Sequence, residues 1–193
     1  SGDTYNFFKK VAGYDTLRMI LCKKAILGEG DSDELVIQKA YMQLNDGRVP
    51  IEDGIEVISV GVSFLRFLEL ADCIQTKIAV VTDNDGDMAA INKKYENYMG
   101  ANQKDYIKIC VDDVVDTGTL KIGNNDYNYN TLEPKLLKAN GLDKLNCIFG
   151  TDYTDEDDLR KFMKHNKTEC ALKIFESTEH IEIPEYILEA IRW

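Results

Sequence analysis

The stretch Ala25-Ile-Leu-Gly-Glu-Gly-Asp-Ser-Asp33 joins a short apolar run to a cluster of acids, and Ile78-Ala-Val-Val-Thr-Asp-Asn-Asp-Gly-Asp87 repeats this arrangement. Each apolar run has the composition of a short buried strand. Carboxylates gathered where strands end repel one another, so the arrangement is unfavourable unless a hard divalent cation such as Mg²⁺ neutralises them. The two stretches therefore predict a metal site, with phosphate chemistry as its use.

Strand and helix patterns alternate outward from these stretches. Four short apolar runs are expected to form buried strands: residues 25–27, 56–60, 77–81 and 106–111. Apolar residues recur at helical spacing in the segments Ile37–Leu44, Phe64–Ala71 and Met88–Tyr98, and Asp31 or Ser32 is expected to cap the first of these helices. This alternation predicts an α/β fold with a parallel sheet flanked by helices.

Additional helices are expected at both ends of the chain. Residues 4–22 have a helical pattern broken near Gly13, and residues 183–193 form a closing helix with Pro in its first turn. A further helix, capped by Thr154, should carry an apolar stripe as far as Ile174, and the Asn- and Gly-rich residues before it suggest a loop or hairpin. We expect three regions: a helical lead-in (1–23), the α/β core (24–117), and a loop with C-terminal helices (118–193).

Composition excludes several classes of protein. The 193 residues, 44% of them hydrophobic, are enough for one core domain and argue against disorder. No apolar run reaches the roughly twenty residues of a membrane span, and no signal peptide is visible, which predicts a soluble cytoplasmic protein. The five scattered cysteines are expected to be reduced thiols. Because the chain begins with Ser, we expect the natural protein to be longer.

The net charge of −11 argues against a free-standing nucleic-acid binder, whose affinity would come mainly from Lys and Arg. Positive charge is nevertheless concentrated between Arg160 and Lys173, where five basic residues accompany one acid. We predict that Arg160, Lys161 and Lys164 contact a phosphate backbone, with metal ions offsetting the acidic pocket. If the strand order is 2-1-3, Glu29 and Asp83 lie past the carboxyl ends of adjacent strands and share that pocket.

Several motifs resemble the C-terminal half of OLD (overcoming lysogenization defect) family endonucleases. They are Asp15-Thr-Leu-Arg18, Leu27-Gly-Glu-Gly-Asp-Ser-Asp-Glu-Leu35, Ser59-Val-Gly-Val-Ser-Phe64, Val81-Thr-Asp-Asn-Asp-Gly-Asp87, Asn130-Thr-Leu-Glu133 and Lys167-Thr-Glu-Cys-Ala-Leu172. The resemblance spans most of the chain and implies a Rossmann-like Toprim sheet over the core. It also implies a metal-dependent DNA endonuclease related to the nuclease subunit of Gabija anti-phage defence.

The resemblance also implies roles for individual residues. Two Mg²⁺ or Mn²⁺ ions would be bound by five acids: Glu29, Asp33, Asp83, Asp85 and Glu133. Glu29 and Lys167 match the catalytic positions of the family. The helical phase of Lys167, four residues after Met163 and three before Cys170, places it at the edge of the apolar stripe. A lysine directed inward there can stabilise charge on a phosphate.

The resemblance further implies partners. Members of the family join an ABC-type ATPase domain to the nuclease domain, and no G-x-x-x-x-G-K-[ST] motif occurs in these residues. ATP would therefore act only through an ATPase domain that these residues do not include. DNA is the expected substrate, a homodimer is a possible assembly, and no membrane partner is expected.

Two alternatives remain open. Asp83-Asn-Asp85-Gly also resembles the first motif of haloacid-dehalogenase phosphatases, with Asp83 as nucleophile and Asp85 as general acid, although Asp87 replaces the Thr of that motif. A non-catalytic scaffold or assembly domain, in which the acidic loops are merely solvated, is the second alternative. A calcium-binding EF-hand is excluded, because it would need Gly at Met88 and Glu at Lys94.

Overall fold

A computed structural model of the chain describes residues 2–10 and 13–193. Val11 and Ala12, at the expected helix break near Gly13, lie outside the described residues. The strands are β1 (Lys24–Gly28), β2 (Ile55–Ser59), β3 (Ile78–Val81), β4 (Ile107–Cys110), β5 (Lys121–Ile122) and β6 (Asn125–Asp126). The helices are α1 (Gly2–Lys10), α2 (Tyr14–Leu21), α3 (Asp31–Leu44), α4 (Phe64–Ile74), α5 (Met88–Lys94), α6 (Leu132–Asn140), α7 (Leu142–Phe149), α8 (Glu156–His165), α9 (Lys167–Glu176) and α10 (Glu185–Arg192). Two short 3₁₀ helices are η1 (Pro50–Asp53) and η2 (Gly100–Asn102).

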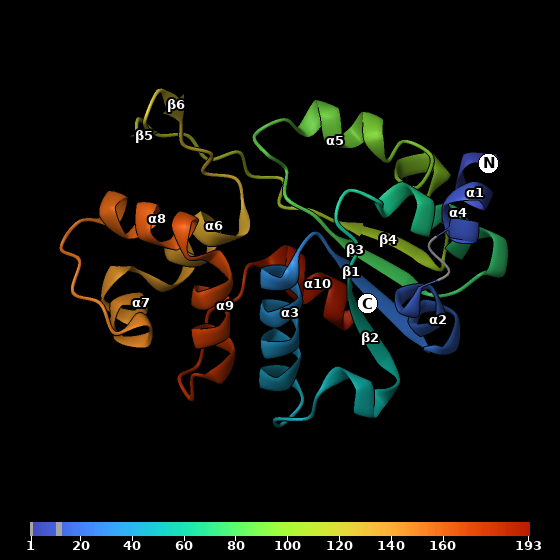
Figure 1. Cartoon of the computed structure of the whole chain (residues 1–193), viewed down its shortest axis with the longest axis horizontal. Helices are drawn as coiled ribbons and strands as arrows, with labels where there is room; N and C mark the ends of the chain where they lie inside the picture. The colour runs from blue at the N-terminus through green and yellow to red at the C-terminus, as the bar shows by residue number, and fades with distance from the viewer. Residues whose placement is uncertain (1, 11–12) are drawn as a thin grey trace.

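The main sheet has four parallel strands in the order β2-β1-β3-β4, which confirms the predicted parallel α/β fold (Figure 1). The first three strands have the 2-1-3 order that a shared pocket of Glu29 and Asp83 requires. Strand β1 lies between β2 and β3, pairing Gly28 with Ser59 on one side and Leu27 with Val80 on the other. The carboxyl ends of β1 and β3 are therefore neighbours. The acids that follow these strands start from the same edge of the sheet.

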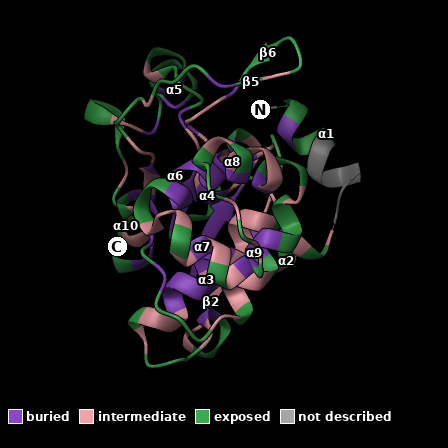
Figure 2. Ribbon diagram, turned by 90° about the vertical axis from the view of Figure 1, so that its left-hand side faces the viewer, coloured by how far each residue is buried: buried purple, intermediate pink, exposed green. Residues whose placement is uncertain are grey.

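Alternate residues along each strand enter two different cores. Leu27 and Val80 pack on one face with Phe64 and Leu68 of α4, and helices α2 and α5 complete this side. The other face is covered by α3 and α10, with α6 to α9 packed outside them (Figure 1). Buried residues run through the sheet and the inner faces of these helices, while the β5–β6 hairpin is largely exposed (Figure 2). The C-terminal helices thus share one core with the sheet.

Three local predictions were wrong. Helix α3 begins one residue earlier than expected, because Gly30 is its N-cap and neither Asp31 nor Ser32 caps it. Helix α5 ends at Lys94, although Tyr95 beyond it is fully buried. Two helices replace the single one expected after Thr154: Asp155 caps α8, and α9 starts anew after Asn166. The chain turns there because the Asn166 side chain donates a hydrogen bond of 2.8 Å to the Phe162 carbonyl.

In the part of the chain that the structure describes, no helix is both long enough and apolar enough to cross a membrane.

Candidate metal centre

A cavity of about 340 Å³ opens at the carboxyl edge of the sheet, where four segments distant in sequence meet. Its polar lining includes Glu29, Asp31, Asp33, Asp83, Asp85, Glu133 and Lys167. All five predicted metal ligands and the predicted catalytic lysine therefore surround one space. A larger hollow of about 540 Å³ lies between α6 and α10, but its wall is more apolar and it does not contain these acids.

Asp33 is oriented by the turn that starts α3. Its Oδ2 accepts a hydrogen bond of 2.9 Å from the Gly30 amide, which turns the side chain back toward the end of β1. Burial and the nearby charges of Glu29 and Glu133 raise the pKa of Asp33 to about 6, although the Gly30 hydrogen bond opposes this shift. Asp33 therefore gives up its proton at neutral pH less readily than an exposed aspartate.

The close approach of β1 to α3 requires a glycine at position 28. A Cβ at Gly28 would lie 2.8 Å from the Asp33 Cβ, which is closer than real contacts allow. We expect Gly28→Ala to lower the free energy of unfolding by about 1–3 kcal/mol, measured by urea denaturation, because the start of α3 must shift. Gly30→Ala is the matched control, since its Cβ would meet only Asp33 Oδ2 at 3.8 Å. Equal stability of both variants would contradict this prediction.

Asp83 is the most perturbed acid of the cavity. Burial, followed by repulsion from Asp33, Glu133, Glu29 and Asp85, raises its pKa to about 8. Without a cation, this carboxyl group is largely protonated at neutral pH. The electrostatic repulsion predicted from the sequence is thus present in the fold, and a divalent cation would relieve it.

Asp85 lies in a left-handed turn with φ of 49°, in the loop between β3 and α5. Its Oδ1 accepts a hydrogen bond of 2.9 Å from the side-chain amide of Asn128, which follows the β5–β6 hairpin. The hairpin region therefore helps to hold a side chain of the cavity. Sequence reasoning assigned no such role to residues 118–130.

Glu133 and Lys167 form an ion pair across the cavity. Lys167 Nζ lies 3.1 Å from Glu133 Oε1, and the Glu133 side chain is only 7% exposed, whereas that of Lys167 is 49% exposed. Thr131 Oγ1 donates a hydrogen bond of 3.2 Å to the other carboxylate oxygen of Glu133. Lys167 does point into the cavity as predicted, but it does so from the first turn of α9 rather than from the middle of a long helix.

The donor set of the cavity fits a hard divalent cation, because its side chains offer carboxylate oxygens and carry excess negative charge. Among the described residues, no three His, Cys, Asp or Glu side chains are placed to hold a single ion. One of the acids, Glu133, is paired with Lys167 instead.

Solved structures share this fold. The C-terminal region of the Burkholderia pseudomallei OLD protein matches with a TM-score of 0.63 and 19% sequence identity, covering 89% of this chain and 96% of that one. The C-terminal region of the Xanthomonas campestris pv. campestris OLD protein matches with a TM-score of 0.59 and 19% identity, covering 91% of this chain and 93% of that one. At such identity, these likenesses establish the fold.

Part of the sequence also matches a family model. Residues 20–85 match the family described as "Overcoming lysogenization defect protein-like, TOPRIM domain". Over these residues, the chain is similar to an OLD-like Toprim domain. Toprim domains bind divalent metal ions, and those of OLD proteins are generally of the metal-dependent nuclease type. No curated protein matches the sequence. The matched segment of the Toprim domain ends at Asp85, so the family match does not reach Glu133 or Lys167.

The three predicted DNA contacts lie on α8. Arg160 is paired with Glu156 and Asp157 at 2.6 and 2.7 Å, and it also lies over the Tyr129 ring. Lys161 is paired with Asp158 of the same helix at 2.7 Å. Lys164 is exposed, with its Nζ 5.6 Å from the centre of the Tyr127 ring. The contacts of Arg160 and Lys164 with the two tyrosine rings link the hairpin region to α8. DNA binding by the three basic residues stays a prediction.

Sequence reasoning missed the buried polar residues beside the centre of the Toprim domain. Asn84, Asn130 and Lys135 are 1%, 6% and 5% exposed. One signal was available: Lys135 lies between Pro134 and Leu136 in a helix that also carries the apolar residues Leu132 and Leu137. A lysine in such surroundings needs partners for its charge. The identity of those partners could not be read from the sequence.

Proposed function

We propose that this chain is the nuclease domain of an OLD-family protein and that it hydrolyses phosphodiester bonds of DNA with two Mg²⁺ or Mn²⁺ ions. One observation carries the proposal. Acids from three separate segments line a single cavity at the carboxyl edge of the sheet, and a lysine completes the lining. The non-catalytic scaffold alternative does not account for Asp83, because an aspartate with a pKa near 8 is typical of a functional site and not of a solvated surface.

We assign the metal ligands as Glu29, Asp33, Asp83, Asp85 and Glu133. Two such ions, when bound, stabilise the attacking and leaving oxygens of an in-line displacement at phosphorus. Their charge would also hold the surrounding carboxylates in the ionised form. Asp33 would then keep its orientation through the Gly30 amide, and Asp85 through Asn128.

Lys167 and Glu29 are proposed as catalytic residues. Lys167 Nζ is close to the cavity acids yet half exposed, so it can turn from Glu133 to a phosphate oxygen and stabilise developing negative charge there. Glu29 is exposed at the cavity mouth, just before the N-terminus of α3, and the dipole of that helix favours an anionic group nearby.

The partners of the domain follow from the same proposal. DNA is its substrate, and the negative charge of the chain makes additional positive surface necessary for tight binding. We propose that an N-terminal ABC-type ATPase domain, a homodimer, or both supply that surface. Because the chain resembles the Gabija nuclease subunit, we propose anti-phage defence as the biological setting.

Cleavage of duplex DNA tests the proposal. We expect the purified protein to nick or cut DNA with Mn²⁺ or Mg²⁺ and to lose at least about 100-fold of this activity in Glu29→Ala, because that variant removes an interaction made at the reacting phosphate. Asp126→Ala is the control, since this exposed acid lies on the hairpin away from the cavity. Cleavage by Glu29→Ala at the wild-type rate would contradict the assignment.

The phosphatase alternative makes a different prediction from the same residues. It requires Asp83 to attack as an ionised nucleophile, whereas the fold raises the pKa of this group to about 8 without a cation. A small phosphate monoester distinguishes the two functions. If the protein hydrolysed the monoester in an Asp83-dependent reaction and left duplex DNA intact, the result would support the phosphatase assignment and contradict the nuclease assignment.

A further inference from the structure

Two loops that belong to no helix or strand follow the neighbouring strands β3 and β4. Loop 83–87 carries Asp83 and Asp85, and loop 112–116 follows strand β4. The second loop contributes no side chain to the cavity lining. It nevertheless makes polar contacts with three buried side chains, those of Asn84, Asn130 and Lys135.

Lys135 binds loop 112–116 from the α6 side. Its ammonium group lies 2.7 Å from Asp112 Oδ2 and 2.8 Å from Asp116 Oδ2, and it donates a hydrogen bond of 2.8 Å to the Val114 carbonyl. These three contacts use all three donors of the ammonium group. Burial lowers the pKa of Lys135, but the hydrogen bonds to the two aspartates outweigh it and raise the pKa overall. The buried cation therefore stays charged.

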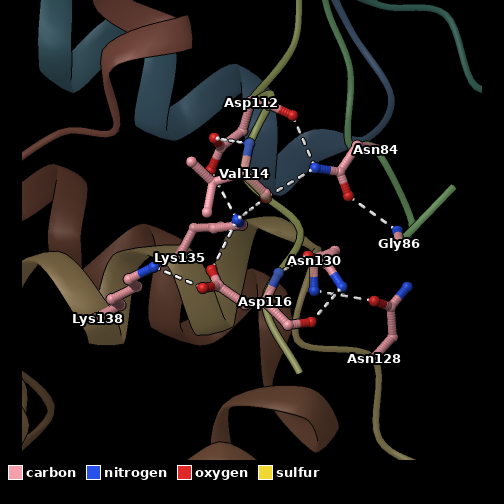
Figure 3. A network of polar contacts seen from close by, with 9 residues as sticks. All are labelled: Asn84, Gly86, Asp112, Val114, Asp116, Asn128, Asn130, Lys135 and Lys138. Carbon is pink, nitrogen blue, oxygen red and sulfur yellow. Dashed lines mark hydrogen bonds and ion pairs between the residues drawn. The ribbon is translucent and has the colours of Figure 1, made fainter. Parts of the chain in front are cut away.

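Asn84 binds the same loop from the other side, as Figure 3 shows. Its Nδ2 donates to the carbonyls of Asp112 and Val114 at 2.7 and 3.0 Å, and its Oδ1 accepts from the Gly86 amide at 2.8 Å. The amide of this one side chain thus fixes loop 83–87 to loop 112–116. Asn84 stands between the two aspartates of the proposed centre, so their positions depend on this attachment.

Asn130 makes a third attachment. Its Oδ1 accepts from the Asp116 amide at 2.7 Å, and its Nδ2 donates to the Asp116 carbonyl at 2.9 Å. Asn130 and Lys135 stand on either side of Glu133 in the sequence, and both hold loop 112–116 (Figure 3). The position of Glu133 relative to loop 83–87 is therefore set through loop 112–116.

We propose that Lys135 is a positioning residue that fixes the distance between Glu133 and loop 83–87, and thereby forms the binding site of one of the two cations. This inference rests on the proposed function. A buried ion pair is weak evidence for stability, since apolar residues of similar size often replace such pairs without loss. Fixing one arrangement of two loops is a role that apolar contacts fulfil poorly, because hydrogen bonds are directional.

Lys138 provides a matched control one turn along the same helix. It pairs with Asp116 Oδ1 at 2.6 Å, but its side chain is 59% exposed. Lys135→Met and Lys138→Met therefore change the net charge equally and remove a contact to the same aspartate. Only the first removes the buried attachment of loop 112–116.

Titration with Mn²⁺ alone, followed by calorimetry, measures the expected difference. Wild type and Lys138→Met should bind two ions with affinities within about twofold of each other. Lys135→Met should weaken one of the two sites at least about tenfold and leave the other unchanged. In the metal-free protein, hydrogen exchange at the amides of Gly86 and Asp116 should become faster in Lys135→Met and not in Lys138→Met.

A second variant keeps the test valid if Lys135→Met does not fold. Lys135→Met combined with Asp112→Asn and Asp116→Asn removes the buried cation together with the acids facing it, and it should also lose one Mn²⁺ site. Two wild-type sites in either folded variant would overturn the inference, as would failure of both variants to fold, which would make Lys135 a folding residue. Absence of Mn²⁺ binding by the wild type would overturn the proposed function and this inference with it.

Discussion

Asp83→Asn is expected to stabilise the metal-free protein and to abolish metal-dependent DNA cleavage. The fold raises the pKa of Asp83 to about 8 from its ordinary value of 3.8, so burying its ionised form is unfavourable. An amide of the same shape carries no charge and therefore removes this penalty. Since one pKa unit corresponds to about 1.4 kcal/mol, we expect a gain on the order of 2 kcal/mol at neutral pH.

The free energy of unfolding of the metal-free protein should depend on pH, because the pKa of Asp83 differs between the folded and unfolded states. Asp83 binds a proton more tightly in the folded state, so the resulting stability is fully present below the unfolded pKa and is lost as the pH rises through about 8. Asp33, whose pKa is raised to about 6, contributes to the same loss of stability as the pH rises to about 6. We therefore expect the free energy of unfolding of the metal-free wild type to fall between about pH 5 and pH 8, and to fall much less in Asp83→Asn.

Urea denaturation in the presence of EDTA measures both effects. Asp85→Asn is the matched control, because Asp85 lies two residues away in the same loop but is exposed. This control should change stability by less than about 0.5 kcal/mol. A metal-free Asp83→Asn protein that is less stable than the wild type would show that the carboxylate is stabilised by contacts other than a cation. DNA cleavage by Asp83→Asn at the wild-type rate would show that Asp83 is not a ligand of the proposed metal centre.

Much of the fold could be predicted because local sequence and long-range packing agree there. The runs around Ile26 and Val80 are apolar on both faces, which is how strands of a covered parallel sheet must be. The helix boundaries after residue 154 could not be predicted, because the apolar stripe continues across Asn166 while the chain turns. A side-chain bond to the backbone decided that break, and periodicity contains no information about it.

The candidate site, like the fold, could be predicted only in part from the sequence. Glu29 and Asp83 could be placed together because each follows a strand, and parallel strands bring their carboxyl ends to one edge. The attachment of Asn128 to Asp85 and the contacts of Lys135 join segments that no periodic pattern relates. Only the folded chain shows which polar groups meet, so the supporting contacts of a site are less predictable than its acids.

Lys167→Met is expected to separate cation binding from catalysis. In the metal-free protein, Lys167 Nζ lies 3.1 Å from Glu133 Oε1 and competes with any cation for that carboxylate. Removing the ammonium group should therefore tighten binding of Mn²⁺ at the proposed Glu133 site several-fold. Because the Lys167 side chain is half exposed, its ion pair contributes little to folding, and stability should change by less than about 1 kcal/mol.

Cleavage should respond to Lys167→Met in the opposite direction, because the ammonium group is needed to stabilise charge on the reacting phosphate. We expect DNA cleavage to fall at least about 100-fold at saturating Mn²⁺, where any gain in cation affinity no longer matters. Lys121→Met is the matched control: it makes the same change of charge on strand β5, where the Lys121 side chain is 64% exposed and pairs with Asp126, and it should keep wild-type cleavage within about threefold. Weaker Mn²⁺ binding together with lost cleavage would mean that Lys167 supports the cation site instead of competing with it, and undiminished cleavage would exclude Lys167 from catalysis.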